Sequence, residues 1–212
     1  MNALAVARRQ LAGTHVVDEW GLDPDWVSLA SSAAGLRWSL AVGGGEHLPS
    51  RGPTLVVVNN RPLAASLAVA LIGIRRETGR VLRIVGIPDV APIGPVLRRL
   101  GGVLHHPQEV AGLLRAGQVP AIPCRAEWRL NGRVGRVDAE LVGAAIRTSA
   151  PVIPVAVLAS PWGRHARVEI GPAVRAKRRR GPLATAELAD AARAAVQRLV
   201  DEATPPGARW LV

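Results

Sequence analysis

A buried strand that passes directly into a helix is the feature of this sequence that most restricts its fold. Residues 55–58 read Leu-Val-Val-Val, and an aliphatic run rich in valine is typical of a strand buried on both faces. Residues 62–74 begin with a proline and are rich in alanine and leucine, so they predict a helix. Asn59, Asn60 and Arg61 therefore lie between the two elements. In an open α/β sheet this position faces the crevice in which ligands bind.

Strands and helices alternate along the rest of the chain. We expect further strands at residues 37–42, 81–85, 119–122, 152–157 and 168–170. We expect further helices within residues 3–20 and at residues 23–36, 92–100, 107–116, 138–148 and 185–202. This alternation predicts an α/β fold with a mixed, largely parallel central sheet and helices on both faces.

The chain length fits one compact domain, because 212 residues can bury a sizeable core. We expect residues 1–50 to form an N-terminal appendage of helix and strand, and residues 51–174 to form the α/β core. Residues 175–212 are expected to form a basic linker followed by an amphipathic helix.

The positive charge of the chain is distributed unevenly. The formal net charge is +11, yet residues 1–50 carry a net charge of −2 and the remainder carries +13. A basic body favours an anionic partner, either a membrane surface or a nucleic acid, although the same arginines also suit a solvated surface. The chain lacks Phe and Tyr as stacking platforms and has no recognisable reading helix, so nucleic acid is the least favoured partner.

The cysteine content and the hydropathy of the chain predict where in the cell the protein lies. Cys124 is the sole cysteine, so an intrachain disulfide is excluded and a reducing environment fits. The first residues lack the order of charge before apolar core that a signal peptide has, and the apolar segment 62–74 is shorter than the ~20 residues that span a bilayer. We therefore expect a cytoplasmic protein, peripheral on the inner face of the plasma membrane.

Several short blocks follow one another in a characteristic order. They are GPTLVVVN at residues 52–59, PIGPVLRRLG at 92–101, LLRAG at 113–117, APVIPVAV at 150–157 and IGP at 170–172. In this order and spacing the blocks resemble the glycerolipid (lysophospholipid, or 1-acylglycerol-3-phosphate) acyltransferase family, over residues 18–174. The resemblance implies a glycerol-phosphate acyltransferase-like α/β fold. It also implies acyl-CoA or acyl carrier protein as acyl donor if the chain is active, with no other cofactor.

The residues that carry the family's chemistry are replaced in this chain. In the family the strand ends in Asn-His, with an Asp after four intervening residues, and the His is the general base that the Asp orients. Here Asn60 and Ala65 occupy those two positions. Loss of a general base typically costs about 10²–10⁴ in rate. The family's Pro-Glu-Gly-Thr-Arg motif, which binds the acceptor, is replaced by Pro-Cys-Arg-Ala-Glu at residues 123–127. We therefore expect a pseudoenzyme that binds a lipid, an acyl group or a partner protein at the membrane surface.

The candidate substrate- or phosphate-binding residues follow the predicted strand ends. They are Asn59, Asn60, Arg61, Cys124, Arg125 and Arg129. Arginines at strand ends can grip a phosphate with two hydrogen bonds, and they can also simply be solvated. Cys124 has no base beside it in the sequence, so a buried, inert thiol is expected.

Two alternatives to the pseudoenzyme remain open. One is an active acyltransferase with a rearranged site that recruits His105, His106 or His165. The other is a basic nucleic-acid-binding module. No metal site is expected, because the paired histidines lack further ligands at a suitable spacing.

Overall fold

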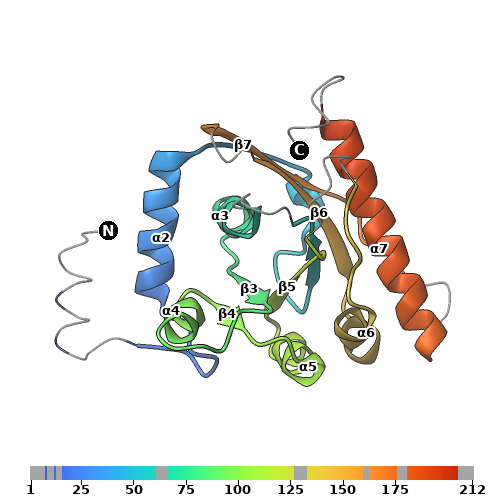
Figure 1. Ribbon diagram of the computed structural model, residues 1–212, viewed down its shortest axis with the longest axis horizontal. Coiled ribbons are helices and arrows are strands. Elements are labelled where there is room, and N and C mark those ends of the chain that lie inside the picture. Colours follow the sequence, from blue (N-terminus) through green and yellow to red (C-terminus); the bar gives the residue numbers. More distant parts are fainter. Residues whose placement is uncertain are drawn as a thin grey trace.

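The computed structural model describes residues 8, 12, 16–60, 66–126, 133–159, 163–175 and 181–204. Its centre is a seven-stranded sheet with the order β1-β7-β6-β2-β5-β3-β4 (Figure 1). The strands are β1 Ser39–Gly43, β2 Leu55–Val58, β3 Leu82–Val85, β4 Gly102–Val103, β5 Val119–Pro123, β6 Val152–Ala159 and β7 His165–Ile170. Neighbouring strands are parallel except for β6 and β7, which are antiparallel. The predicted mixed, largely parallel sheet is confirmed.

Helices cover both faces of the sheet. They are α2 Pro24–Arg37, α3 Ser66–Thr78, α4 Ile93–Arg99, α5 Pro107–Arg115, α6 Ala139–Thr148 and α7 Pro182–Ala203, with a 3-10 turn, η1, at Gly45–His47. The helices α2, α3 and α4 lie on one side of the sheet, and α5, α6 and α7 lie on the other (Figure 1). None of the described helices is long and apolar enough to cross a bilayer.

The valine-rich strand β2 lies between the two hydrophobic cores, one on each face of the sheet, and contributes side chains to both. Leu55 and Val57 pack with the α5, α6 and α7 side, whereas Val56 and Val58 pack with the α3 side. All four side chains are fully buried. The period of two along a strand explains this division, because successive side chains point to opposite faces. The prediction of a strand buried on both faces is confirmed.

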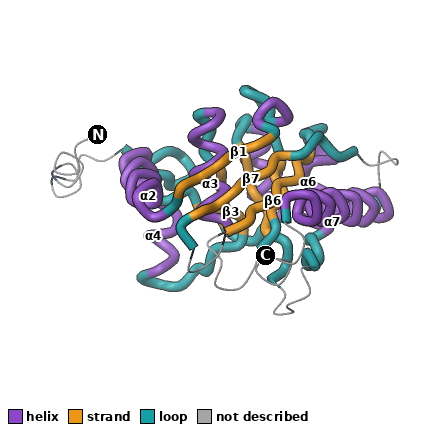
Figure 2. Tube along the Cα trace, turned by 90° about the horizontal axis from the view of Figure 1, so that it is seen from above, coloured by secondary structure: helices purple, strands orange, loops and turns teal. Residues whose placement is uncertain are grey.

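The N-terminal segment contributes to this sheet. Asp23 caps α2, since its Oδ1 accepts hydrogen bonds from the backbone N–H of Asp25 at 2.9 Å and of Trp26 at 3.3 Å. The next element, β1, pairs with β7 at the sheet edge, and Figure 2 shows β1, β7 and β6 side by side. The helix expected within residues 3–20 lies mostly outside the described residues, and residues 16–20 are not helical.

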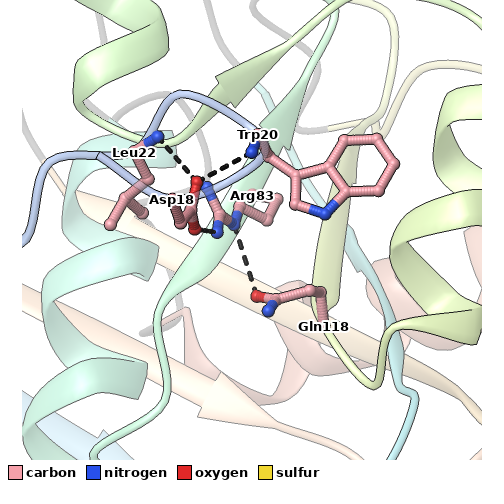
Figure 3. A network of polar contacts seen from close by, with 5 residues as sticks. All are labelled: Asp18, Trp20, Leu22, Arg83 and Gln118. Atoms are coloured by element: carbon pink, nitrogen blue, oxygen red, sulfur yellow. Dashed lines mark hydrogen bonds and ion pairs between the residues drawn. The ribbon is translucent and has the colours of Figure 1, made fainter. Parts of the chain in front are cut away.

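A buried ion pair fastens this N-terminal segment to the amino end of β3 (Figure 3). Arg83 is only 2% exposed, and its Nη2 donates to Oδ2 of Asp18 while its Nε donates to Oε1 of Gln118 at 3.4 Å. Oδ1 of Asp18 accepts from the backbone N–H of Trp20 at 3.0 Å and of Leu22 at 2.9 Å. Burial by itself raises the pKa of Asp18, but these hydrogen bonds and the Arg83 charge outweigh it, so the pKa is lowered.

Candidate functional site

An apolar cavity of about 460 Å³ lies where β2, β3 and β5 end, and we call it the edge pocket. Its lining includes Ala30 of α2, Leu71 of α3, Gly86 after β3, Leu97 of α4 and Pro123 of β5. Among the described residues that line it, Asn60 supplies the one polar side chain. The carboxyl edge of a largely parallel sheet is where ligands bind in α/β folds, and the size is typical of a small-ligand site.

Two larger hollows lie elsewhere on the molecule. One, of about 870 Å³, is lined by Arg75, Arg76, Arg164 and His165 between α2 and the edge strand β1. The other, of about 1190 Å³, is an open depression between α6 and α7. Neither is lined by residues 59–60 or by the residues that follow β3 and β5. The edge pocket is therefore the candidate site, although it is smaller.

Asn59 holds the sheet together at the pocket. Its Nδ2 donates to the carbonyl oxygen of Val157 at 2.8 Å, and its Oδ1 accepts from the Val157 N–H at 2.6 Å. The side-chain amide thus continues the β2–β6 pairing by one step beyond the last strand residue. Since both partners are buried, the cost of leaving these backbone groups unpaired explains why an amide stands here.

Asn60 is the candidate residue that the structure places in the pocket wall. It is half-buried and follows Asn59, whose two hydrogen bonds fix the backbone before it. A carboxamide has no basic nitrogen, so it cannot accept a proton from a substrate near neutral pH. Arg61 and Ala65, which the sequence also singles out, lie outside the described residues, and so does Arg129.

Cys124 points away from the edge pocket. Its side chain is buried in the cluster formed with α5, α6 and α7, on the opposite face of the sheet. Burial raises the pKa of the Cys124 thiol to about 12, and the positive charge of Arg193 offsets only part of this effect. The prediction of a buried thiol is confirmed. Arg125, the next residue, is exposed, and its backbone N–H donates to the Arg136 carbonyl at 2.8 Å.

The three histidines that an active acyltransferase with a rearranged site would recruit lie in different surroundings. His106 caps α5, because its Nδ1 accepts from the Gln108 N–H at 3.3 Å. His165 begins β7 and is exposed. His105 follows β4, and its Nε2 lies 3.1 Å from Oδ2 of Asp138. The described residues contain no group of three or more side chains suited to a metal ion.

Known proteins resemble this chain in sequence and in structure. No family model matches it. An uncharacterized protein of Mycobacterium tuberculosis is 28% identical over 175 residues, covering 72% of this chain and 48% of the relative. An uncharacterized protein of Mycobacterium leprae is 29% identical, covering 72% of this chain and 47% of the relative. The chain therefore spans about half the length of the curated relatives it matches.

The structural likeness decides the fold. The crystal structure of PlsC, the 1-acyl-sn-glycerophosphate (LPA) acyltransferase of Thermotoga maritima, matches with a TM-score of 0.63 and 19% identity. The match covers 84% of this chain and 78% of that one. The chain has the PlsC acyltransferase fold. The acyltransferase-like α/β architecture that the sequence blocks imply is thereby confirmed, and at this identity the likeness concerns the fold alone.

The edge pocket lies at the carboxyl end of β2 in this acyltransferase-like fold. In this chain the described part of that region offers an amide at residue 60 and apolar side chains around it. The arrangement is suited to hold a hydrocarbon chain, because burial of apolar surface is favourable and an apolar wall has no side-chain groups that could hydrogen-bond a polar ligand.

Proposed function

We propose that this protein binds the acyl chain of a lipid or of an acyl thioester in the edge pocket. We also propose that it has lost the proton transfer that acyltransferases perform with a histidine, since Asn60 stands at that position. The observation that carries the proposal is the composition of the pocket, whose described lining is apolar apart from Asn60. A methylene group transferred from water into such a site contributes about 0.8 kcal/mol, so a fatty acyl chain gains several kcal/mol there.

The proposed loss of acyl transfer rests on two replaced motifs that are far apart in the sequence. Asn60 and Ala65 stand where the family has its base and the carboxylate that orients it, and residues 124–127 do not retain the acceptor motif. A site without a base and without a grip on the acceptor's phosphate has no means of directing the acyl group to lysophosphatidic acid. We therefore expect no protein-dependent transfer to that acceptor.

We also propose that the protein meets an anionic membrane surface with the outer face of α4. Val90, Ile93 and Val96 are 62%, 56% and 42% exposed. Leu97 and Leu100, on the same segment, line the edge pocket. Arg98, which pairs with Asp89 at 3.6 Å, and Arg99 lie in the last turn of α4, and the body of the chain is strongly basic. Exposed aliphatic side chains beside cationic ones are suited to an anionic lipid interface, from which a chain would enter the pocket.

Filling the edge pocket tests the binding proposal. Ala30→Trp places an indole in the pocket from α2, so the dissociation constant for the fluorescent fatty acid cis-parinaric acid should rise at least about tenfold, or 1.4 kcal/mol. Ala33→Trp is the matched control, because Ala33 is exposed on the same helix and lines neither the pocket nor the neighbouring hollow. Equal affinities of the two variants in a fluorescence titration would refute binding in this pocket.

Flotation with vesicles of phosphatidylglycerol and phosphatidylcholine tests the membrane proposal. The wild-type chain should float at low salt and less so at high salt, because salt screens the charge attraction. Ile93→Glu should lower the bound fraction severalfold. Leu183→Glu changes an aliphatic residue of similar exposure (65%, against 56% for Ile93) on α7, across the sheet, and should have no effect. A wild-type chain that stays unbound at low salt would contradict the proposal.

A further inference from the structure

His105 and Asp138 form a fixed histidine–carboxylate pair at the carboxyl edge of the sheet. Asp138 is the N-cap of α6, and its Oδ1 accepts from the backbone N–H of Glu140 at 2.9 Å and of Leu141 at 3.2 Å. Its other oxygen, Oδ2, lies 3.1 Å from Nε2 of His105. The helix therefore fixes the carboxylate, and the carboxylate orients the imidazole.

The backbone that carries His105 is held on both sides. The Leu104 N–H donates to Oε2 of Glu109 at 3.1 Å, and the His106 N–H donates to the Leu104 carbonyl at 2.9 Å. His106 in turn caps α5. The imidazole of His105 thus belongs to a short, bonded connection between β4 and α5, which keeps it in place beside the sheet edge.

The second ring nitrogen of His105 lies near Gly86, a residue that lines the edge pocket, although His105 itself is not part of that lining. A Cβ built on Gly86 would be 3.7 Å from Nδ1 of His105, and Gly86 is part of the pocket lining. The side chain of His105 is 59% exposed, so water reaches the ring. An imidazole oriented through one nitrogen, with the other nitrogen near a ligand site and water, has the arrangement of a general base.

We propose that His105 is the general base for hydrolysis of an acyl thioester whose chain lies in the edge pocket, with Asp138 as its positioning residue. This activity rests on the acyl-chain binding proposed above. Nδ1 of His105 takes a proton from water while the water oxygen bonds to the thioester carbonyl carbon. The carbon–sulfur bond then breaks, and the leaving sulfur receives the proton from His105. The products are a fatty acid and a free thiol, and no further reactant is needed.

Water is the acceptor that the surroundings favour. Residues 124–127 do not retain the motif that would hold a glycerol phosphate, whereas His105 is open to solvent. The loops on this edge also carry positive charge, since Arg125 and Arg136 are both exposed there. A backbone hydrogen bond from the Arg125 N–H to the Arg136 carbonyl holds the two residues side by side, and Arg136 lies two residues before Asp138. Cationic loops favour an acyl carrier that bears phosphates, such as coenzyme A.

Thiol release from lauroyl-CoA, followed with a thiol reagent, tests the assignment. His105→Gln keeps a donor for Asp138 but cannot act as a base, so kcat should fall about 10²-fold or more, and His105→Ala should do the same. Asp138→Asn keeps an oxygen that caps α6 and removes the charge that orients the ring, so kcat should fall while KM stays unchanged. His165→Ala removes an exposed imidazole at β7 and should leave the rate intact.

Binding of cis-parinaric acid is measured on the same variants, which separates this activity from the binding function. Retained binding with lost turnover in the His105 and Asp138 variants supports the assignment. A wild-type chain that binds the fatty acid but releases no thiol overturns the assignment and leaves the binding proposal standing. Turnover that survives His105→Gln overturns it as well. A wild-type chain that does not bind the fatty acid overturns the binding proposal and, with it, this assignment.

Discussion

In a His105→Ala background, a chain that carries Asn60→His together with Ala65→Asp should release thiol from lauroyl-CoA about 10²-fold faster than the chain with His105→Ala alone. Residue 60 lines the edge pocket, so an imidazole there would stand beside the acyl group. A positioned general base contributes about 10²–10⁴ to a rate, and we expect the lower end because the surrounding residues are not adapted to it. The His105→Ala background ensures that the added rate belongs to the restored pair.

The two single substitutions are the controls for this restoration. Asn60→His alone lacks the carboxylate that orients the ring, and Ala65→Asp alone lacks a base, so each should give a smaller gain than the pair. Retention of cis-parinaric acid binding shows that the pocket has kept its shape. A double variant no faster than either single variant would contradict the alignment of Asn60 and Ala65 with the family's histidine and aspartate.

Asp18→Asn should lower the free energy of unfolding by about 2–3 kcal/mol near neutral pH. Removal of one partner from a buried ion pair typically costs about 3–5 kcal/mol, and Asp18 itself is 34% exposed, which reduces the loss. The variant leaves the guanidinium of Arg83 buried without its carboxylate. For a chain of this size the melting temperature should fall by about 4–12 °C, measured by circular dichroism.

The effect of Asp18 should depend on pH in a defined direction. Its pKa is lowered in the folded chain, so its stabilisation is present above the unfolded value of ~3.9 and is lost as the pH falls through the folded pKa. Urea unfolding should therefore show a smaller difference between wild type and Asp18→Asn at about pH 3 than at about pH 7. Asp89→Asn, at an exposed pair with Arg98, should cost only about 0–1 kcal/mol. An equally large loss in that control would contradict the role of burial.

The sequence predicts the central strand well because its signal is local. Four consecutive aliphatic residues leave no polar face, and the structure has β2 over the same residues, Leu55–Val58. The cap of α2 at Asp23 is predicted equally well, since proline and acidic residues mark a helix start within a few positions. In contrast, β4 has only two residues, and no run or alternation of that length can be recognised.

The site is less predictable because its residues act through distant partners. Asn59 has the position of a ligand-binding residue at a strand end, yet its amide completes the pairing with β6, nearly a hundred residues later. His105 and Asp138 meet only when the end of β4 and the start of α6 reach the same edge. Arg83 is part of an apolar strand pattern, and nothing near it in the sequence reveals Asp18 as its partner.

The most direct test of acyl-chain binding is to map where a fatty acid makes contact. A palmitic acid that carries a photoreactive diazirine on its chain is irradiated with the wild-type protein, and the labelled residues are identified by mass spectrometry. Binding in the edge pocket predicts label on α2, α3 and residues 84–88, and competition by unlabelled palmitic acid. Label confined to the arginine-lined hollow beside β1, or to the α6–α7 depression, would contradict it.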